Sequence, residues 1–276
     1  MLPLDHFSHG LINPALAYGI SFIGSLLGLR CAFHAETARL NLGWLAAAAV
    51  ALGGTGIWVM HFTAMLGFTI NGSVVHYDMG ITLLSAIVAV VIVFLGLWIV
   101  TSGDRGWSRL ALGGATTGLG VAAMHYLGMS AMHTGARITY AAPMVALSLV
   151  IAVVAATAAL WFMLNIRSLV TSVIASLIMA LAVNGMHYTA MAAMSAYPDH
   201  HAGSPSGAAP VELLTPLITC VALVVMALFV VVGLAELEVR GNTVAPVASA
   251  GSPNALRTTD PATLAASGRQ WPRKPS

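Results

Sequence analysis

Three histidines recur at near-constant spacing, each inside a long apolar run. They are His61, His125 and His187, which are separated by 64 and 62 residues. Each follows a methionine and precedes an aromatic residue, in the segments MHFT, MHYL and MHYT. A soft thioether beside an imidazole suits copper better than calcium, magnesium or manganese. Because ionisable residues inside apolar runs are costly and mark functional sites, the three histidines predict a shared metal site.

A second methionine follows each histidine by four residues. Residues at i and i+4 of a helix lie on one face, one turn apart. The predicted metal ligands are His61, His125, His187, Met60, Met65, Met124, Met129, Met186 and Met191. A single histidine of this kind can also serve only to hydrogen-bond a neighbouring helix, and Met132 and Met194 are interpreted as packing residues. Three equivalent positions at one depth favour the shared site.

The composition is that of an integral membrane protein. The chain has 276 residues, of which 58% are hydrophobic and only 7% charged, and its mean hydropathy is +0.88. Uncharged apolar runs long enough to cross a bilayer lie at residues 11–29, 42–68, 79–100, 110–132, 143–164, 169–194 and 213–234. We therefore predict an all-α membrane protein with seven transmembrane helices. Its partner is the lipid bilayer, and the pI near 8.7 does not indicate nucleic-acid binding.

The positions of the basic residues predict the orientation in the membrane. They fall between the first and second, third and fourth, and fifth and sixth runs, and after the seventh, which all lie on one side. Arg137 alone falls on the other side. The positive-inside rule therefore places the N-terminus outside and the C-terminus in the cytoplasm. At about 1.5 Å per residue, the three histidines then lie in the outer third of the membrane.

An internal repeat organises the apolar runs. Ser21, Ser85 and Ser148, in the odd-numbered runs, precede the three histidines by 40, 40 and 39 residues. This spacing predicts three copies of a two-helix unit followed by an unpaired seventh helix, although each serine by itself also fits an ordinary helix contact. We predict an outer N-terminal segment at residues 1–10, a seven-helix membrane domain at 11–235 and a disordered cytoplasmic tail at 236–276.

The segments MHFTAML, MHYLGMSAM and MHYTAMAAM resemble the motifs of the MHYT domain, a family of bacterial integral membrane sensors. Phe62 replaces tyrosine in the first copy, and Leu127 replaces threonine in the second. The resemblance covers residues 10–235 and implies six core spans, often followed by a seventh, in the bacterial inner (cytoplasmic) membrane. It also implies a copper site that senses oxygen, carbon monoxide or nitric oxide. The matching residues are Met60, His61, Met124, His125, Met186 and His187.

The predicted function is that of a membrane signalling sensor. The ligand types favour Cu(I), with an open coordination position for a diatomic gas. Many relatives carry cyclic di-GMP enzyme modules or a DNA-binding module after the last helix. The tail here is expected to hold no output domain, so a separate cytoplasmic effector protein is the expected partner.

Catalysis by this chain is not expected, because no predicted span carries Asp, Glu, Lys or Arg and no nucleophile lies beside a base. Two other functions remain open. One is copper transport or metal handling in the membrane. The other is a bis-histidine haem protein, in which His61 and His187 are the axial ligands.

Overall fold

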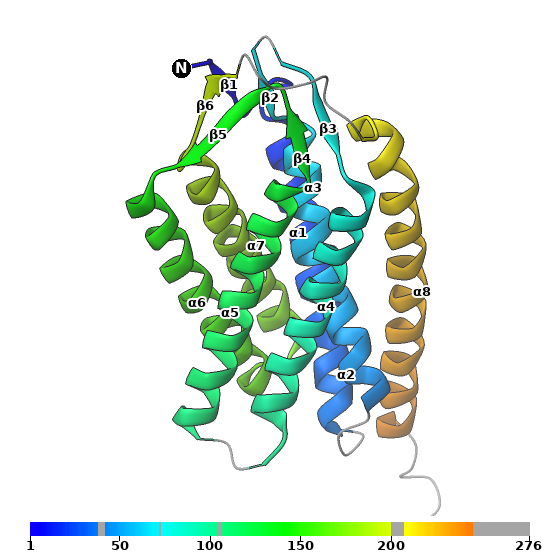
Figure 1. Cartoon of the computed structure of the whole chain (residues 1–276). Coiled ribbons are helices and arrows are strands. Elements are labelled where there is room, and N and C mark those ends of the chain that lie inside the picture. Colours follow the sequence, from blue (N-terminus) through cyan, green and yellow to red (C-terminus); the bar gives the residue numbers. More distant parts are fainter. Residues whose placement is uncertain (38–41, 72, 104–105, 200–206, 245–276) are drawn as a thin grey trace, which may run out of the picture. The chain divides into compact units, whose positions relative to one another are not determined.

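A computed structural model of the chain describes residues 1–37, 42–71, 73–103, 106–199 and 207–244. Residues Met1–Val232 form one compact unit, and the described residues 233–244 belong to a second. The described residues form seven long helical segments (Figure 1). These are α1 (Ile12–Thr37), a continuous segment of α2 (Leu42–Ala49), η1 (Val50–Val59) and α3 (Met60–Met65), α4 (Met79–Thr101), α5 (Trp107–Ser130), α6 (Ala142–Asn165), α7 (Leu169–Ala192) and α8 (Pro210–Val244). The helical architecture predicted from the composition is confirmed.

Six of these seven segments are long and apolar enough to cross a membrane, and the seventh, α5, does not meet this criterion. Residues 107–130 include five glycines, which lowers the mean hydropathy of this helix. It packs between α4 and α6, so its small residues lie against other helices. The last segment, α8, continues to Val244. Residues 245–276, most of the predicted disordered tail, lie outside the described residues.

The first six segments pack side by side as a closed ring. Each packs on the next along the chain, and α7 packs back on α1. Two close approaches hold η1 in this ring. A Cβ atom on Gly24 of α1 would lie 2.3 Å from the backbone nitrogen of Gly56, and one on Gly53 would lie 2.6 Å from the carbonyl oxygen of Ala89 in α4. Small residues therefore let α1 and α4 contact the backbone of η1 directly.

The segment η1 is a π-helix of ten residues that ends immediately before Met60 and His61. Such wide turns are rare and occur mostly as short insertions in α-helices at functional sites. The apolar run predicts an ordinary helix here, because hydropathy does not distinguish the hydrogen-bonding pattern of a π-helix from that of an α-helix. The π-helix is continuous with α3, the short helix that carries the first histidine.

Six short strands cover one end of the ring, which we call the strand end. They are β1 (Leu4–Asp5), β2 (Thr69–Ile70), β3 (Val75–Tyr77), β4 (Met132–Thr134), β5 (Ala136–Tyr140) and β6 (Met194–Pro198). They pair as the antiparallel sheets β1–β2, β3–β4 and β5–β6. Each sheet joins the strand before one helix pair to the strand after it, so the order strand, helix, helix, strand occurs three times (Figure 1). The sequence analysis did not predict these strands, because their partners are distant in sequence.

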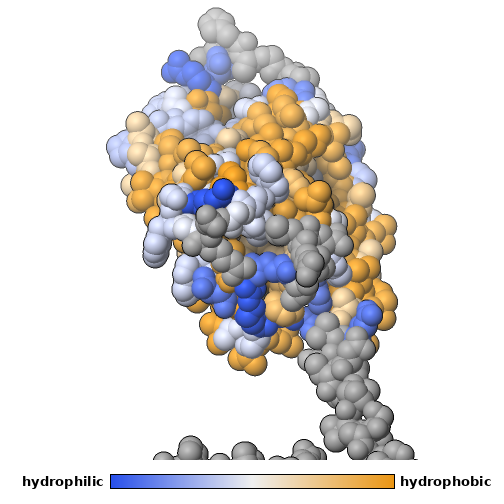
Figure 2. All heavy atoms as spheres, turned by 90° about the horizontal axis from the view of Figure 1, so that it is seen from below, coloured by the Kyte–Doolittle hydropathy of each residue, from blue (hydrophilic) through white to orange (hydrophobic). Residues whose placement is uncertain are grey.

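The opposite end of the ring carries charged side chains, and here the sequence analysis was wrong. It expected no charged residue in a span, but α1 extends to Thr37 and includes Arg30 and Glu36. Glu36 forms a 2.6 Å ion pair with Arg167, and Arg30 donates to the carbonyl oxygen of Arg167 at 3.2 Å. Paired charges near a helix end are tolerated in a membrane. Figure 2, which views this end, shows hydrophilic residues gathered on it with hydrophobic residues on the flanks.

Candidate metal centre

The three histidines meet inside the ring, near its strand end. They come from α3, α5 and α7, and each is only 1% exposed. His61 Nδ1 lies 3.0 Å from His187 Nδ1 and 3.1 Å from His125 Nδ1. The three ring centroids lie 4.8, 5.0 and 5.2 Å apart, with the rings nearly perpendicular to one another. The convergence that the sequence spacing predicted is therefore present in the structure.

The cluster is not a closed hydrogen-bond network. A neutral imidazole offers one N–H donor and one lone pair. Among the described residues, Nε2 of His61 and Nε2 of His125 have no hydrogen-bond partner, although both atoms are buried. Whichever tautomer each ring adopts, these atoms leave a proton or a lone pair unpaired, at a cost of about 1–3 kcal/mol each. Buried groups that stay unpaired fit a site that binds another group.

The donor set fits a metal ion. The ligand nitrogens of the three histidines all lie within 4.8 Å of one another, and imidazole is the commonest metal ligand in proteins. Within the described part of the chain, this metal-ligand group contains no carboxylate and no cysteine. The group is therefore uncharged when each imidazole carries a single ring proton and no ion is bound, and its ligand atoms are the nitrogens of these three side chains.

An aromatic ring lies edge-on to each histidine. Phe62, Tyr126 and Tyr188 lie 4.8, 5.0 and 4.9 Å from the preceding imidazole, centroid to centroid, at angles of 79° to 84°. The sequence analysis predicted that these residues pack between helices or orient the imidazoles. Each ring contacts its histidine and lies in or against the core, so packing is confirmed, and a role in orienting the imidazoles stays a prediction.

Two of the three repeated serines hydrogen-bond side chains on the histidine-bearing segments. Ser85 accepts a hydrogen bond of 3.0 Å from Trp58 Nε1, and Ser148 lies 2.9 Å from Tyr126 Oη. Ser21 is fully buried, yet its hydroxyl has no partner among the described residues. The serines therefore link neighbouring helix pairs at two of three equivalent positions, which their spacing in the sequence did not reveal.

Gly128 is a site residue that sequence reasoning missed. A Cβ atom there would lie 2.7 Å from His61 Nε2 and 3.4 Å from Phe62 Cζ. The imidazole of His61 thus lies directly against the backbone of α5. One signal was available: three residues after each histidine stand Ala64, Gly128 and Ala190, so the second copy alone has glycine at this position.

The six methionines proposed as ligands are all buried, with exposures of 1% to 3%. Met60 packs with Ala17 and Ala64 in a small cluster, apart from the main core that contains the other five. Within the described ranges, the hydrogen bonds of the three imidazoles join them only to one another. Coordination by methionine therefore stays a prediction.

Other histidines lie on the strand end. His76 and His133 face each other across β3 and β4, and the ring of His6 lies 5.4 Å from that of Phe68. Burial lowers the pKa of His6, with the nearby Asp5 opposing the shift. Two further histidines, at 200 and 201, lie outside the described residues. Among the described residues, His6, His76 and His133 are not part of the metal-ligand group.

The fold and the cluster define a class: a multi-helix protein with candidate membrane spans and a buried group of three histidines able to hold a metal ion. The sequence pattern of the MHYT family, described as a bacterial signalling protein N-terminal repeat, matches residues 54–113 and 118–176. The chain therefore carries MHYT repeats, and the recognition from its motifs is confirmed. Each matched repeat begins in or just before a histidine-bearing helix and runs into the following unit.

Several curated relatives are named as signalling proteins or as cyclic di-GMP enzymes. The chain is 34% identical over 243 residues to the bifunctional diguanylate cyclase/cyclic di-GMP phosphodiesterase MucR of Pseudomonas aeruginosa, covering 86% of this chain and 35% of that protein. It is 39% identical over 147 residues to the cyclic di-GMP phosphodiesterase NbdA of the same organism, covering 51% and 19%. An uncharacterized signaling protein of Caulobacter vibrioides is 32% identical over 193 residues, covering 69% and 24%.

The chain spans about a third or less of the length of these relatives. The activities in their names are therefore those of much longer proteins, of which this chain matches a part. No solved structure matches the chain.

Proposed function

We propose that this chain is a membrane signalling sensor with a copper(I) site at His61, His125 and His187. The observation that carries the proposal is the convergence of three buried imidazoles from three helix pairs, with Nδ1 atoms 3.0 and 3.1 Å apart. When bound, copper(I) supplies an open coordination position for oxygen, carbon monoxide or nitric oxide. The protein's own contribution is to hold three neutral imidazoles together and to exclude water from them.

The charge of the site supports copper(I) over a divalent ion. The cost of burying an ion rises with the square of its charge, and no carboxylate in the described chain joins the three histidines. A monovalent ion therefore needs less compensation here than zinc or copper(II). Methionine sulfur would add soft ligands, and Met60, Met65, Met124, Met129, Met186 and Met191 are the residues we propose for that role.

The same geometry disfavours haem. In bis-histidine haem proteins the two axial nitrogens bind opposite faces of the iron. His61 Nδ1 and His187 Nδ1 are in hydrogen-bond contact at 3.0 Å, so a porphyrin plane would have to separate two rings that pack directly together. Copper transport is the other alternative, and no feature of the described residues specifically favours it.

The route of the signal follows from how the ligands are attached. Each histidine lies near the end of a helix that continues into a strand, so a shift of one ring moves both a helix and a sheet. His61 is the second residue after the π-helix η1, a wide helical turn of a kind that occurs mostly at functional sites. We propose that ligand binding biases this segment between two arrangements and thereby carries the change toward the opposite end.

Orientation and partner complete the proposal. We place the strand end and the N-terminus outside the cytoplasmic membrane and the C-terminus in the cytoplasm, which is supported by the distribution of basic residues. The names of two relatives point to cyclic di-GMP signalling. We propose a cytoplasmic effector of that class, carried on a separate chain, as the receiver of the signal, and no catalysis by the residues of this chain.

The decisive experiment is metal analysis of the purified membrane protein, with absorption spectra before and after dithionite. We expect near-stoichiometric copper, no haem bands, and a copper-bound carbonyl stretch after addition of carbon monoxide to the reduced protein. His61→Ala, His125→Ala and His187→Ala should each lose most of the copper, whereas Met132→Leu, a nearly isosteric change outside the ligand set, should keep it. Unchanged copper in all three histidine variants would refute the site.

A second experiment separates sensing from transport. Proteoliposomes that contain the wild-type protein should accumulate no more Cu(I) than empty vesicles. Saturable uptake that His125→Ala abolishes would instead establish a copper permease.

A further inference from the structure

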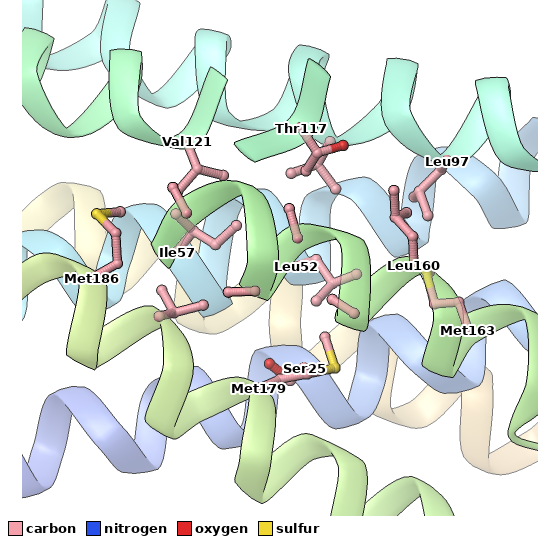
Figure 3. A pocket seen from close by; sticks show the side chains of 16 residues that line it. Ser25, Leu52, Ile57, Leu97, Thr117, Val121, Leu160, Met163, Met179 and Met186 are labelled. Atoms are coloured by element: carbon pink, nitrogen blue, oxygen red, sulfur yellow. The ribbon is translucent and has the colours of Figure 1, made fainter. Parts of the chain in front are cut away.

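An apolar cavity of about 50 Å³ lies at the centre of the helix ring. Side chains from all six ring segments line it, and Figure 3 shows them pointing inward from several helices. Two of its residues, Ser25 and Thr117, carry a hydroxyl group, and the others are alanine, valine, leucine, isoleucine and methionine. The cavity is not part of the histidine cluster.

The cavity lies one helical turn from the cluster. Ile57, Val121 and Val183 line it, and each precedes one of the three histidines by four residues. Residues at this spacing share a helix face and are about 6 Å apart along the axis. Met186, next to His187 in sequence, also lines the cavity. The cavity and the imidazoles are therefore stacked along the same axis, with the cavity on the side away from the strands.

Water is a poor occupant of this space. A buried water molecule needs about two to four polar partners, whereas apolar cavities stay dry and bind apolar molecules such as xenon or benzene. The lining offers few polar atoms, and Thr117 Oγ1 has no hydrogen-bond partner in the described chain. A water molecule needs about 10–15 Å³ of such space, so a cavity of about 50 Å³ has room for a molecule slightly larger than water.

We propose that this central cavity binds one small apolar molecule of the size of a diatomic gas and passes it to the imidazole cluster one turn away. The binding of a small apolar molecule is inferred from the cavity alone. The transfer of that molecule to the metal rests on the proposed sensor function. Apolar gases dissolve well in hydrocarbon, so the membrane interior can supply such a molecule directly to the ring.

Xenon is the probe for the site, because it is apolar and requires no metal. Crystals of the purified chain under xenon pressure should show one anomalous peak between Ile57, Val121 and Met186. Ala156→Leu, which places a larger side chain in the cavity, should abolish it. Ala146→Leu on the same helix is the matched control, because residue 146 is exposed and does not line the cavity. A wild-type protein with no xenon in the cavity would overturn the proposal, whether or not Ala156→Leu folds.

The two parts of the proposal fail separately. His125→Ala should keep the xenon peak even though it loses the metal, so a failed metal site leaves this result intact. In the reduced copper-loaded protein, carbon monoxide should bind more slowly to Ala156→Leu than to Ala146→Leu. If Ala156→Leu lost the xenon peak but bound carbon monoxide as fast as Ala146→Leu, the cavity would be a binding site but not a route to the metal. If the wild-type protein bound copper and carbon monoxide but showed no xenon peak, the cavity proposal would be wrong and the proposed sensor function would stand.

Discussion

Gly128→Ala is the change that tests the geometry of the cluster most directly. The new Cβ atom would lie 2.7 Å from His61 Nε2, whereas ordinary contacts begin at 3.4 Å. The imidazole must therefore retreat by at least 0.7 Å, the difference between these distances. Because the obstructing atom belongs to α5, the retreat takes His61 away from the helix that carries His125. Metal sites hold their ligand distances to about 0.2 Å, so this shift is large for the site.

The expected magnitude is a loss of about 10–100-fold in metal affinity, the range found when the groups that orient a ligand are disturbed. The effect on folding should be smaller. Overpacking costs about 1–3 kcal/mol, and replacement of a helical glycine by alanine returns about 0.5–1 kcal/mol. A weakened site in a protein that still folds is therefore the characteristic result.

The assay is titration of the reduced, detergent-purified protein with Cu(I) against a competing chromophoric chelator. Gly185→Ala is the matched control, since residue 185 also lies in a histidine-bearing helix and a Cβ atom there meets nothing within 4 Å. We expect the control to bind copper like the wild type. If Gly128→Ala bound with wild-type affinity as well, the close approach of α5 to His61 would not determine the site, and the reasoning would be wrong.

Three further predictions concern stability. Gly24→Ala places a Cβ atom 2.3 Å from the backbone nitrogen of Gly56 and should lower the free energy of unfolding by about 1–3 kcal/mol or more, whereas Gly19→Ala, with open space around it, should not; equal thermal midpoints in detergent would contradict the close packing. Burial raises the pKa of Tyr77 above the ordinary value of about 10. Above that pH the unfolded chain holds fewer protons than the folded one, so stability should fall as pH rises, and Tyr77→Phe should flatten the decline of the thermal midpoint. If the proposed metal ion is bound, its removal by a chelator should also lower the midpoint, since a ligand at one hundred times its Kd stabilises the folded state by about 2.7 kcal/mol. A midpoint that does not move would mean that the wild type holds no ion there.

The amino-acid sequence by itself determined the class of the protein and the identity of the three central residues. Hydropathy is a local property, so the apolar runs predicted the helices, and all seven predicted runs are helical over most of their length. The spacing of His61, His125 and His187 predicted that they share one depth, because helices of similar length carry them equally far. The recurring motif also identified the MHYT repeats.

Features that depend on distant partners were not predictable in this way. The three sheets join segments far apart in the chain, such as β5 and β6, and their strands are too short for a periodic signal. The inclusion of Arg30 in α1 depends on the carbonyl oxygen of Arg167, 137 residues further along the chain. Hydropathy along the chain predicts that the span ends before Arg30, the first charged residue. In the folded chain the guanidinium of Arg30 has a hydrogen-bond acceptor, and the helix continues past it.

The tertiary structure alone decided the inner geometry of the site. Helical spacing puts Met65, Met129 and Met191 on the same faces as their histidines, and it does not decide where the methionine before each histidine lies. In the structure Met60 packs in a separate apolar cluster, while the imidazoles face one another. The contact of His61 with Gly128 and the cavity beneath the cluster depend on how far apart six helix backbones lie. Those distances come from side-chain packing between helices, which has no signature within any single helix. The sequence determined which groups are present at this depth, and packing determined which of them meet.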